Sequence, residues 1–314
     1  MKNELKFREN GCFKIVQFTD IHWQNGEPVD QQSAALMESV AQAEVPDLIV
    51  LTGDILSGGG CDDAAESLRQ IIEILERCDF PWAAVFGNHD DEGTANRHEL
   101  MEVMQESDLS LAEPGPEDIP GVGNYVLTVE SSDGTKSAAL LYFVDSGSYA
   151  PTDIGGYDWI RRAQIEWYLS ESRRYTASAG NPLPALAFFH IPIPEYDEVW
   201  DFHTCYGAKY EKVCPPLINS GFFAALHEAG DVMGTFVGHE HINDFWGDLH
   251  GIRLCYGRTT GFNCYGKEGF PRGARVIQLR EGERQFETWL HLENGTIVNE
   301  QQEHKPLQRT LTED

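Results

Sequence analysis

The sequence predicts an α/β fold that contains a parallel β-sheet. Two observations carry this prediction. Short continuous apolar runs alternate with segments of helical spacing over residues 13–90, and each apolar run is followed at once by polar side chains. Continuous apolar runs are typical of strands buried on both faces, and a β-α-β-α-β order is typical of sheets covered by helices. A hydrophobic content of 41% is sufficient for a packed core.

The N-terminal part of the chain contains three predicted strands separated by two predicted helices. The strands are expected over residues 13–19, 47–52 and 82–86, and the helices over residues 31–43 and 62–77. The second helix repeats apolar side chains at positions 64, 65, 68, 71, 72 and 75, and acidic residues occupy its first turn, as helix N-termini favour. Ligands of such sheets bind outside the carboxyl ends of the strands.

The remaining chain is expected to mix helices with further strands. A short helix at 97–105 precedes a loop rich in proline, glycine and acid at 106–123, and a β-hairpin follows with Asp133 and Gly134 in its turn. The other expected elements are strands over residues 125–130 and 138–144, a helix over 159–175, a strand over 186–189, a helix over 217–227, and strands over 232–237, 252–256, 274–279 and 286–292.

Two segments are expected to lack regular structure. Pro192 and Pro194 exclude a continuing helix or central strand. Residues 196–216 are irregular and aromatic and are expected to form a lid or a wall, and the last twenty residues are polar and are expected to be loose. Because no repeat or linker-like stretch interrupts the sequence, we expect a single domain over residues 1–314, with its motifs in residues 13–280 and a polar tail from about residue 295.

Charge and cysteine content bear on partners and location. With 51 acidic and 23 basic residues the net charge is −28, which favours solubility and disfavours nucleic acid and anionic membranes as partners. A phosphate ester would need local positive charge, such as metal ions. Seven cysteines form no Cys-x-x-Cys pair and are expected to be reduced. Residues 1–10 do not resemble a signal peptide, and no apolar run approaches the roughly 20 residues of a membrane span, so we expect a cytoplasmic protein.

Five predicted strand ends carry side chains that can bind metal ions. They are Asp20 with His22, Asp54, Asn88 with His89, His190, and His239 with His241. Each fragment alone has an ordinary explanation, such as a solvated turn, a helix cap or a buried histidine. Together they supply carboxylate, amide and imidazole ligands without a required thiolate, a set that suits Zn, Mn or Fe. A bridging carboxylate with histidines on both sides is typical of a two-metal hydrolytic site.

The order of these fragments resembles the five motifs of the calcineurin-like metallophosphoesterases. The matching fragments are Asp20-x-His22, Gly53-Asp54, Gly87-Asn88-His89-Asp90, His190 and Gly238-His239-x-His241. The wording of His190-Ile-Pro-Ile-Pro-Glu195, Gly238-His-Glu-His-Ile-Asn-Asp244 and Cys255-Tyr-Gly-Arg258 further resembles a branch, related to yeast and plant proteins, that is labelled purple acid phosphatase-like. The resemblance covers residues from about 13 to 279 and implies a four-layer α/β/β/α sandwich.

The resemblance also implies a role for each motif residue. The first metal ion would be bound by Asp20, His22 and His241, the second by Asn88, His190 and His239, and Asp54 would bridge the two. His89 would not be a ligand; it would bind phosphate or protonate the leaving oxygen. A metal-bound hydroxide would attack the phosphorus, because a bound metal ion sharply lowers the pKa of water.

Two positions depart from other members of the superfamily. Purple acid phosphatases carry a tyrosine three residues after the bridging aspartate, and its charge transfer to ferric iron gives their colour, whereas this chain has Ser57 there. Protein serine/threonine phosphatases carry an aspartate and an arginine at the positions of Ser57 and Gly58. The resemblance therefore implies neither the purple colour nor a phosphoprotein substrate.

Further residues near the motifs are candidates for the substrate pocket. They are Glu195, Asn243, Arg258 and Arg272. Arg258 follows a predicted strand and could hold a phosphate with two hydrogen bonds, or it could form an ion pair. An aromatic leaving group could rest on side chains that could equally belong to the core, namely Tyr196, Trp200, Phe202, Tyr206 and Tyr210.

The sequence thus predicts a dinuclear metal-dependent phosphoesterase that hydrolyses a small phosphate monoester or diester. Two alternatives stay open. One is a cyclic nucleotide phosphodiesterase, which uses the same ligand pattern, and the other is a protein-binding module of the same fold that has lost catalysis. The complete set of ligand positions together with His89 favours the enzyme. The substrate, the identity of the metal ions (Mn, Fe or Zn) and the oligomeric state are left open.

Overall fold

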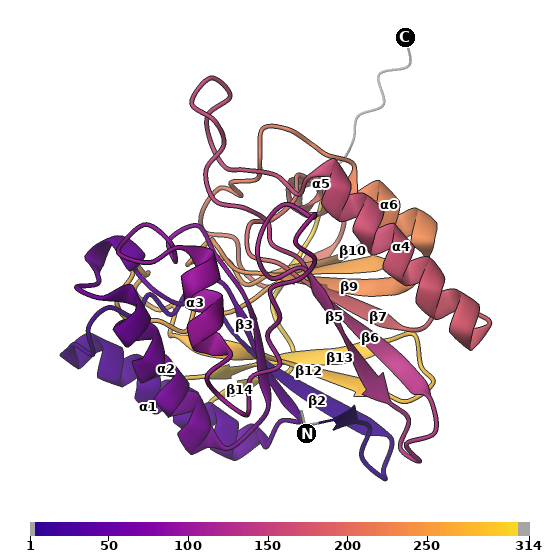
Figure 1. The fold of residues 1–314 in the computed structure, drawn as a ribbon, viewed down its shortest axis with the longest axis horizontal. Coiled ribbons are helices and arrows are strands. Elements are labelled where there is room, and N and C mark those ends of the chain that lie inside the picture. The colour runs from indigo at the N-terminus through magenta and orange to yellow at the C-terminus, as the bar shows by residue number, and fades with distance from the viewer. Residues whose placement is uncertain (1–3, 307–314) are drawn as a thin grey trace.

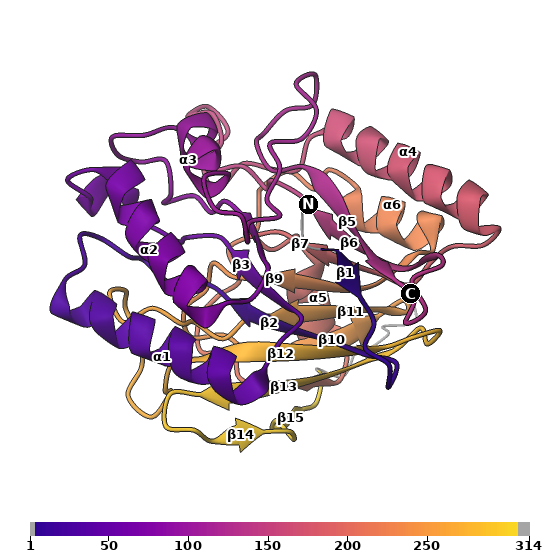
Figure 2. The ribbon, with the colours of Figure 1, turned by 60° about the horizontal axis from the view of Figure 1, so that its bottom comes forward.

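Two β-sheets pack face to face, and helices cover both outer faces (Figures 1 and 2). The structure is a computed structural model and describes residues 4–306. Helices α1, α2 and α3 lie on one side of the sandwich, and α4 and α6 lie on the other (Figure 1). This arrangement confirms the expected four-layer α/β/β/α sandwich.

The six-stranded sheet holds the three predicted N-terminal strands at one side. Its strands are β2 (Cys12–Phe18), β3 (Leu48–Thr52), β4 (Trp82–Val85), β12 (Gly273–Arg280), β13 (Phe286–Leu292) and β14 (Ile297–Val298), in the order β14-β13-β12-β2-β3-β4. Strands β2, β3 and β4 run parallel, whereas β12 pairs antiparallel with β2. The parallel run predicted from residues 13–86 is therefore confirmed.

The nine-stranded sheet follows the order β1-β5-β6-β7-β9-β11-β10-β8-β15. Its strands are β1 (Leu5–Lys6), β5 (Tyr125–Glu130), β6 (Ser137–Phe143), β7 (Ala185–Phe188), β8 (Cys205–Tyr206), β9 (Val232–Val237), β10 (Trp246–Leu249), β11 (Ile252–Tyr256) and β15 (Glu303–His304). Strands β5 and β6 form the predicted antiparallel hairpin, and β6, β7, β9 and β11 run parallel. Both sheets therefore contain parallel strands whose carboxyl ends can meet.

The described part of the chain has six α-helices. They are α1 (Pro28–Glu44), α2 (Ala64–Cys78), α3 (Arg97–Met104), α4 (Arg162–Ala179), α5 (Glu195–Phe202) and α6 (Phe222–Ala229). A capping box between Glu27 and Asp30 starts α1 earlier than expected, with Pro28 in its first turn. Asp63 caps α2 by accepting a hydrogen bond from the backbone N–H of Glu66. No helix within residues 4–306 combines the length and the apolar character needed to cross a membrane.

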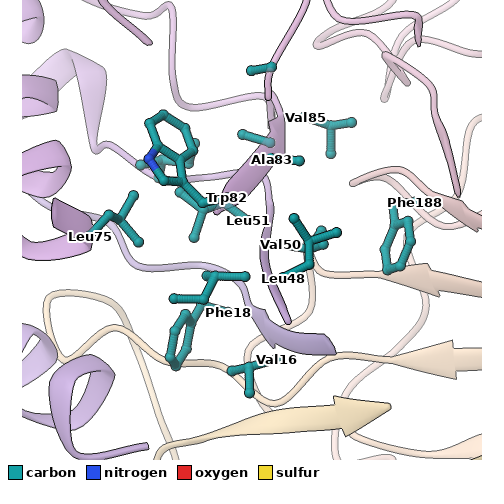
Figure 3. Packing of buried hydrophobic residues seen from close by; sticks show 14 of the residues in the cluster. Val16, Phe18, Leu48, Val50, Leu51, Leu75, Trp82, Ala83, Val85 and Phe188 are labelled. Carbon is teal, nitrogen blue, oxygen red and sulfur yellow. The ribbon is translucent and has the colours of Figure 1, made fainter. Parts of the chain in front are cut away.

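The main core fills the space around the six-stranded sheet. Figure 3 shows Leu75 of α2 beside Trp82 on the helix side and Phe188 of β7 beside Val50 on the side of the second sheet. All four side chains are fully buried. Because strand side chains alternate between faces, the continuous apolar runs of β3 and β4 supply both the helix-facing layer and the layer between the sheets. This explains why those runs show no alternation in the sequence.

Two expectations of irregular structure are wrong. Residues 196–216 contain most of α5 and the strand β8. Pro194 stands immediately before the first residue of α5, and proline is tolerated at the start of a helix. The polar tail is anchored by β14, which pairs with β13, and by β15, which pairs with β8. The part of the tail at 307–314 lies outside the described residues. Strands β1 and β10 were not expected; both are short and paired at or near a sheet edge.

Candidate metal centre

The metal-competent side chains of the sequence converge at one end of the sandwich. Three groups follow β2, β3 and β4 of the six-stranded sheet, and two follow β7 and β9 of the nine-stranded sheet. Hydrogen bonds connect the two sets of strand ends: His190 Nδ1 lies 2.9 Å from the carbonyl oxygen of Thr52, and the backbone N–H of His239 donates to Asp20 Oδ1 at 3.0 Å. The packing of the two sheets thus brings together residues that are more than 200 positions apart.

One group of potential ligands consists of Asp20, His22, Asp54 and His241. One ligand atom from each lies within 4.8 Å of all the others. His22 Nε2 lies 3.0 Å from His241 Nε2 and 3.6 Å from Asp54 Oδ2, and His241 Nε2 lies 3.6 Å from Asp20 Oδ1. All four side chains are buried, so their ligand atoms face one another instead of water.

A second group consists of Asp54, His190 and His239, again with ligand atoms within 4.8 Å of one another. His190 Nε2 lies 3.1 Å from Asp54 Oδ2 and 3.3 Å from His239 Nδ1. The family resemblance assigns Asn88 to the same ion as His190 and His239, and Asn88 Oδ1 is buried without a hydrogen-bond partner within residues 4–306. A buried amide oxygen without a partner is costly, and a cation in this group would satisfy it.

Asp54 is the only side chain that belongs to both of these groups within residues 4–306. Its Oδ2 faces His22 on one side and His190 on the other, while its Oδ1 accepts a hydrogen bond from the backbone N–H of His89 at 2.8 Å. The backbone bond fixes the rotation of the carboxylate. Asp54 would therefore be the carboxylate that two ions could share.

The backbone at these strand ends adopts conformations that few side chains tolerate. Of the seven non-glycine residues with positive φ in the described chain, four are Asp20, His22, Asp54 and His239. Such conformations cost of order 1–3 kcal/mol each and cluster at functional sites. Gly87 is required for a different reason, because a Cβ there would lie 2.2 Å from Asp54 Oδ1. The strained backbone at these positions directs the ligand side chains into the site.

Burial and neighbouring charges shift the pKa values of the candidate ligands in both directions. Burial lowers the pKa of His22 to about 4 and that of His239 to about 3, so both imidazoles are neutral and can donate lone pairs to a metal. Burial raises the pKa of Asp20 to about 7. Burial opposes ionisation of Asp54 as well, but the positive charge of His190 outweighs it and lowers the pKa of Asp54 well below its ordinary value. A dication would favour the ionised form of both carboxylates.

His89 lies next to these groups but belongs to neither of them. Its ring is 5.4 Å from that of His22, and its Nδ1 lies 2.6 Å from Glu92 Oε2. Burial lowers the pKa of His89, but the nearby carboxylates of Asp54 and Glu92 outweigh burial and raise it. Sequence reasoning missed Glu92, although its position three residues after His89 was a usable signal.

Other neighbours support the site without entering it. Ser57 Oγ lies 3.2 Å from His22 Nδ1, which turns His22 Nε2 toward Asp54. Asp90 accepts hydrogen bonds from the backbone N–H groups of Leu56 and Gly87 and so shapes the loops around the site. The Sγ of Cys264 lies within 4.8 Å of His22 and His241 ligand atoms. Burial raises the pKa of the Cys264 thiol to about 12.

Two of the four candidate pocket residues have contacts that indicate a structural role. Arg258 is 4% exposed, pairs with Asp244 at 2.5 Å and donates to the carbonyl oxygen of Pro271, contacts that indicate a structural role in place of phosphate binding. Asn243 is fully buried and accepts hydrogen bonds from the backbone N–H groups of Tyr210 and Glu211, which is also structural.

Glu195 and Arg272 have incomplete sets of contacts. Glu195 Oε1 accepts a hydrogen bond from Asn219, and its Oε2 is buried without a partner within residues 4–306. Arg272 Nη2 donates to the carbonyl oxygens of Cys264 and Tyr265, and its buried Nη1 has no partner in the same range. Burial lowers the pKa of His22 and of His241, and the positive charge of Arg272 adds a smaller effect in the same direction, so Arg272 is an arginine that the structure brings beside the site.

The aromatic side chains near the centre are mostly not the predicted ones. Tyr196 is fully buried, and the partly buried Trp200 stacks on His304 at a ring distance of 3.7 Å, so both pack with the core. Tyr206 stacks on Trp246, whereas Tyr210 and Phe202 are exposed. Two other tyrosines contact the ligand histidines, Tyr157 against His239 at 4.2 Å and Tyr265 against His241 at 4.1 Å between ring centres.

Sequence comparison assigns the chain to a family. The sequence profile described as calcineurin-like phosphoesterase matches residues 13–243. The chain belongs to the calcineurin-like phosphoesterase family. It is 36% identical over 333 residues to "Probable inactive purple acid phosphatase 29" of Arabidopsis thaliana, a match that covers 93% of this chain and 85% of that protein. It is 32% identical over 329 residues to "Phosphatase DCR2" of Saccharomyces cerevisiae, which covers 93% of this chain and 55% of that protein.

Solved structures of low sequence identity share the fold. A dimetal phosphatase from Danio rerio superposes with a TM-score of 0.59 at 14% identity, over 88% of this chain and 98% of that one. GAP50, the anchor in the inner membrane complex of Plasmodium, superposes with a TM-score of 0.54 at 12% identity, over 94% and 88% of the two chains. At these identities the likeness shows the metallophosphoesterase fold alone.

The side chains at the site fit a pair of metal ions. Two groups of buried ligands share Asp54, and the amide oxygen of Asn88, in the loop after β4, is buried without a partner in the described chain. The ligands are oxygen and imidazole nitrogen, which suit hard or borderline cations. The family and this cluster together support a dimetal centre.

Proposed function

We propose that this protein hydrolyses small phosphate monoesters or diesters at a dimetal centre. The observation that carries the proposal is the position of Asp54, whose Oδ2 lies between His22 of one ligand group and His190 of the other. A shared oxygen of this kind offsets the repulsion between two cations and sets their spacing, which is the arrangement of two-metal hydrolases. Two ions at this site would also supply the local positive charge that a phosphate ester needs in a chain of net charge −28.

Each ligand has a proposed role. Asp20, His22 and His241 would hold one ion, and Asn88, His190 and His239 would hold the other, with Asp54 shared. When bound, the ions would lower the pKa of water and neutralise charge on the phosphate. The ligand chemistry supports Mn, Fe or Zn. Arg272 is the proposed additional contact for the substrate, since it is a buried arginine beside the site whose Nη1 has no partner within residues 4–306.

His89 is the proposed general acid. Its Nδ1 is engaged by Glu92, so its Nε2 remains to donate a proton to the leaving oxygen of the ester. His89 comes from the loop that follows β4 and is less buried than the ligands, as a group that meets substrate must be. This role requires no ligation by His89 and agrees with its absence from both ligand groups.

The relatives support hydrolysis unevenly. The curated name of the yeast relative is that of a phosphatase, whereas the plant relatives at 34–36% identity are named probable inactive purple acid phosphatases. Those names describe the plant and yeast proteins and not this chain. This chain carries every ligand position and His89, and this favours catalysis over a purely protein-binding role. A cytoplasmic location stays a prediction, supported by seven free cysteines.

The proposal is tested with one purified sample. Exhaustive chelation, followed by addition of Mn, Zn or Fe, is expected to abolish and then restore hydrolysis of chromogenic phosphate monoesters and diesters. The ratio of the two activities separates a monoesterase from a phosphodiesterase, the cyclic nucleotide enzyme included. Hydrolysis that persists in verified metal-free protein, or a complete absence of hydrolysis with both ions bound, would show that the proposed function is wrong.

A further inference from the structure

Glu92 is connected to two residues of the proposed active site, to His89 directly and to Asn88 through Tyr149. Its Oε2 is 2.6 Å from His89 Nδ1, and its Oε1 accepts a hydrogen bond of 2.6 Å from the hydroxyl of Tyr149. The Tyr149 oxygen in turn accepts a hydrogen bond of 3.2 Å from Asn88 Nδ2. Tyr149 comes from the segment between β6 and α4, whereas the other three follow β4. One carboxylate therefore joins two loops that arise from different sheets.

The bond to Glu92 determines how His89 can act. A carboxylate accepts hydrogen bonds and cannot donate them when ionised, so His89 Nδ1 must carry the proton that is shared with Oε2. The hydrogen bond at one ring nitrogen sets the tautomer and the direction of the other. Nε2 is consequently the ring atom that is turned away from Glu92 and available to a substrate.

The bond to Tyr149 determines how Asn88 can act. The two ends of an amide differ, since the nitrogen donates and the oxygen accepts. Because Asn88 Nδ2 donates to Tyr149, Asn88 Oδ1 points the other way, where it is buried without a hydrogen-bond partner in the described chain. The oxygen is the end of the amide that binds a cation, so the same network that orients His89 also selects the useful end of Asn88.

We propose that Glu92 is a positioning residue: it holds His89 directly, and Asn88 through Tyr149, in the orientations that hydrolysis requires. The inference rests on the proposed function for its catalytic consequence and on the hydrogen bonds alone for the orientations. It assigns a role to a residue outside the motif Gly87–Asp90. An ordinary surface ion pair would place one oxygen near one cation, whereas here each carboxylate oxygen has its own partner at 2.6 Å.

The first experiment measures whether Glu92 acts through His89. Glu92→Ala is expected to lower kcat roughly 10- to 100-fold at saturating metal, as loss of a supporting hydrogen bond does, with KM unchanged and both ions bound. The second ion, which Asn88 would hold, should bind more weakly in this variant, but by no more than in Tyr149→Phe. The loss should be larger for an alkyl phosphate than for nitrophenyl phosphate, because a good leaving group needs less protonation. The double variant His89→Ala with Glu92→Ala should be no slower than His89→Ala alone. Glu102→Ala, at an exposed carboxylate of α3, is the matched control and should leave kcat unchanged.

The second experiment does not need activity. In protein labelled with 15N-histidine, metal-free and zinc-loaded, the wild type is expected to show a downfield Nδ1–H proton that is missing in His89→Ala. Glu92→Ala should lose this signal, and Glu102→Ala should keep it. Tyr149→Phe, which cannot accept from Asn88, should weaken binding of the second ion roughly tenfold and leave the first unchanged.

The outcomes separate the inference from the proposed function. Additive losses in the double variant, equal losses for alkyl and nitrophenyl phosphates, or an Nδ1–H signal that survives Glu92→Ala would overturn the positioning role. A wild type that binds two ions and hydrolyses nothing would overturn the proposed function instead. In that case the NMR signal and the metal affinity of Tyr149→Phe still decide whether Glu92 orients His89 and Asn88.

Discussion

Replacing Asp54 by asparagine should weaken both metal sites at once. Asp54 Oδ1 accepts a hydrogen bond from the backbone N–H of His89 at 2.8 Å, so the oxygen of an asparagine must stay there and its amide nitrogen must take the place of Oδ2. An amide nitrogen has no lone pair for a cation. Since Oδ2 is the atom that faces both His22 and His190, Asp54→Asn removes one negative charge and one shared ligand from both sites.

The magnitude follows from the number of ligands lost. Loss of even a supporting partner of a metal ligand weakens metal binding about 10- to 100-fold. Loss of the shared ligand should therefore lower the affinity for each ion by at least about 100-fold. At saturating metal this corresponds to about 2.7 kcal/mol of folded-state stabilisation per site, or roughly 5–10 °C of melting temperature. His239→Ala removes a neutral ligand from one group only, so it should weaken the binding of one ion and leave the other bound.

The assay is metal content per chain after dialysis, together with the melting temperature with and without added Mn. The wild type should retain about two ions per chain, His239→Ala about one, and Asp54→Asn fewer than His239→Ala. The thermal shift on adding metal should follow the same order. If His239→Ala loses both ions while Asp54→Asn keeps both, the shared position of Asp54 does not describe the metal-bound protein.

Three further predictions concern chemistry, colour and pH. His89→Ala should keep both ions, as measured by metal analysis, and lose roughly 10²- to 10⁴-fold in kcat; loss of the ions instead would make His89 a ligand. The iron-loaded protein should show no strong tyrosinate-to-iron absorption in its visible spectrum, because the position three residues after Asp54, which carries tyrosine in purple enzymes, is Ser57, whose hydroxyl contacts His22. A strong band would show that a tyrosine reaches the metal. Glu44 accepts hydrogen bonds from His291 at 2.9 Å and Trp289 at 3.2 Å; burial opposes its ionisation, but these bonds outweigh burial and lower its pKa. The resulting stabilisation is complete above the unfolded-state pKa and is lost as pH falls through the lower folded-state pKa. Glu44→Gln should therefore reduce the free energy of unfolding by about 1–3 kcal/mol at pH 7 and by much less near pH 3. Urea unfolding curves that give the same difference between variant and wild type at both pH values would contradict this.

The sequence by itself determined the parallel N-terminal sheet and the residues that end its strands. Hydrophobic runs and helical spacing are local signals, and β2, β3, β4, α1 and α2 formed within a few residues of the predicted bounds. Chemistry at a strand end is also local, because a carboxylate or imidazole directly after a buried strand must lie at the rim of the sheet. The candidate ligands could therefore be named without knowing how the two sheets meet.

Regular structure was missed where local signals were weak or misleading. The prolines before α5 suggested a break, yet proline is tolerated beside a helix start, and aromatic residues such as Tyr196 proved to pack in the interior. The short strands β14 and β15 depend on pairing with β13 and β8. Their residues have no apolar pattern of their own, so only the neighbouring strands decide that they are strands.

Only the tertiary structure decided how the ligands, whose grouping the family resemblance had implied, come to face each other and which residues support them. The grouping of His22 with His241, and of Asp54 with His190, depends on the packing of one sheet against the other, which no local pattern encodes. The same is true of Arg258, whose position after a strand suggested phosphate binding but which is held by Asp244 inside the protein. The contact of Glu92 with Tyr149 likewise joins loops 57 positions apart. Side chains acquire such partners from the long-range packing of the chain, and for that reason the orientation of the site emerged only in three dimensions.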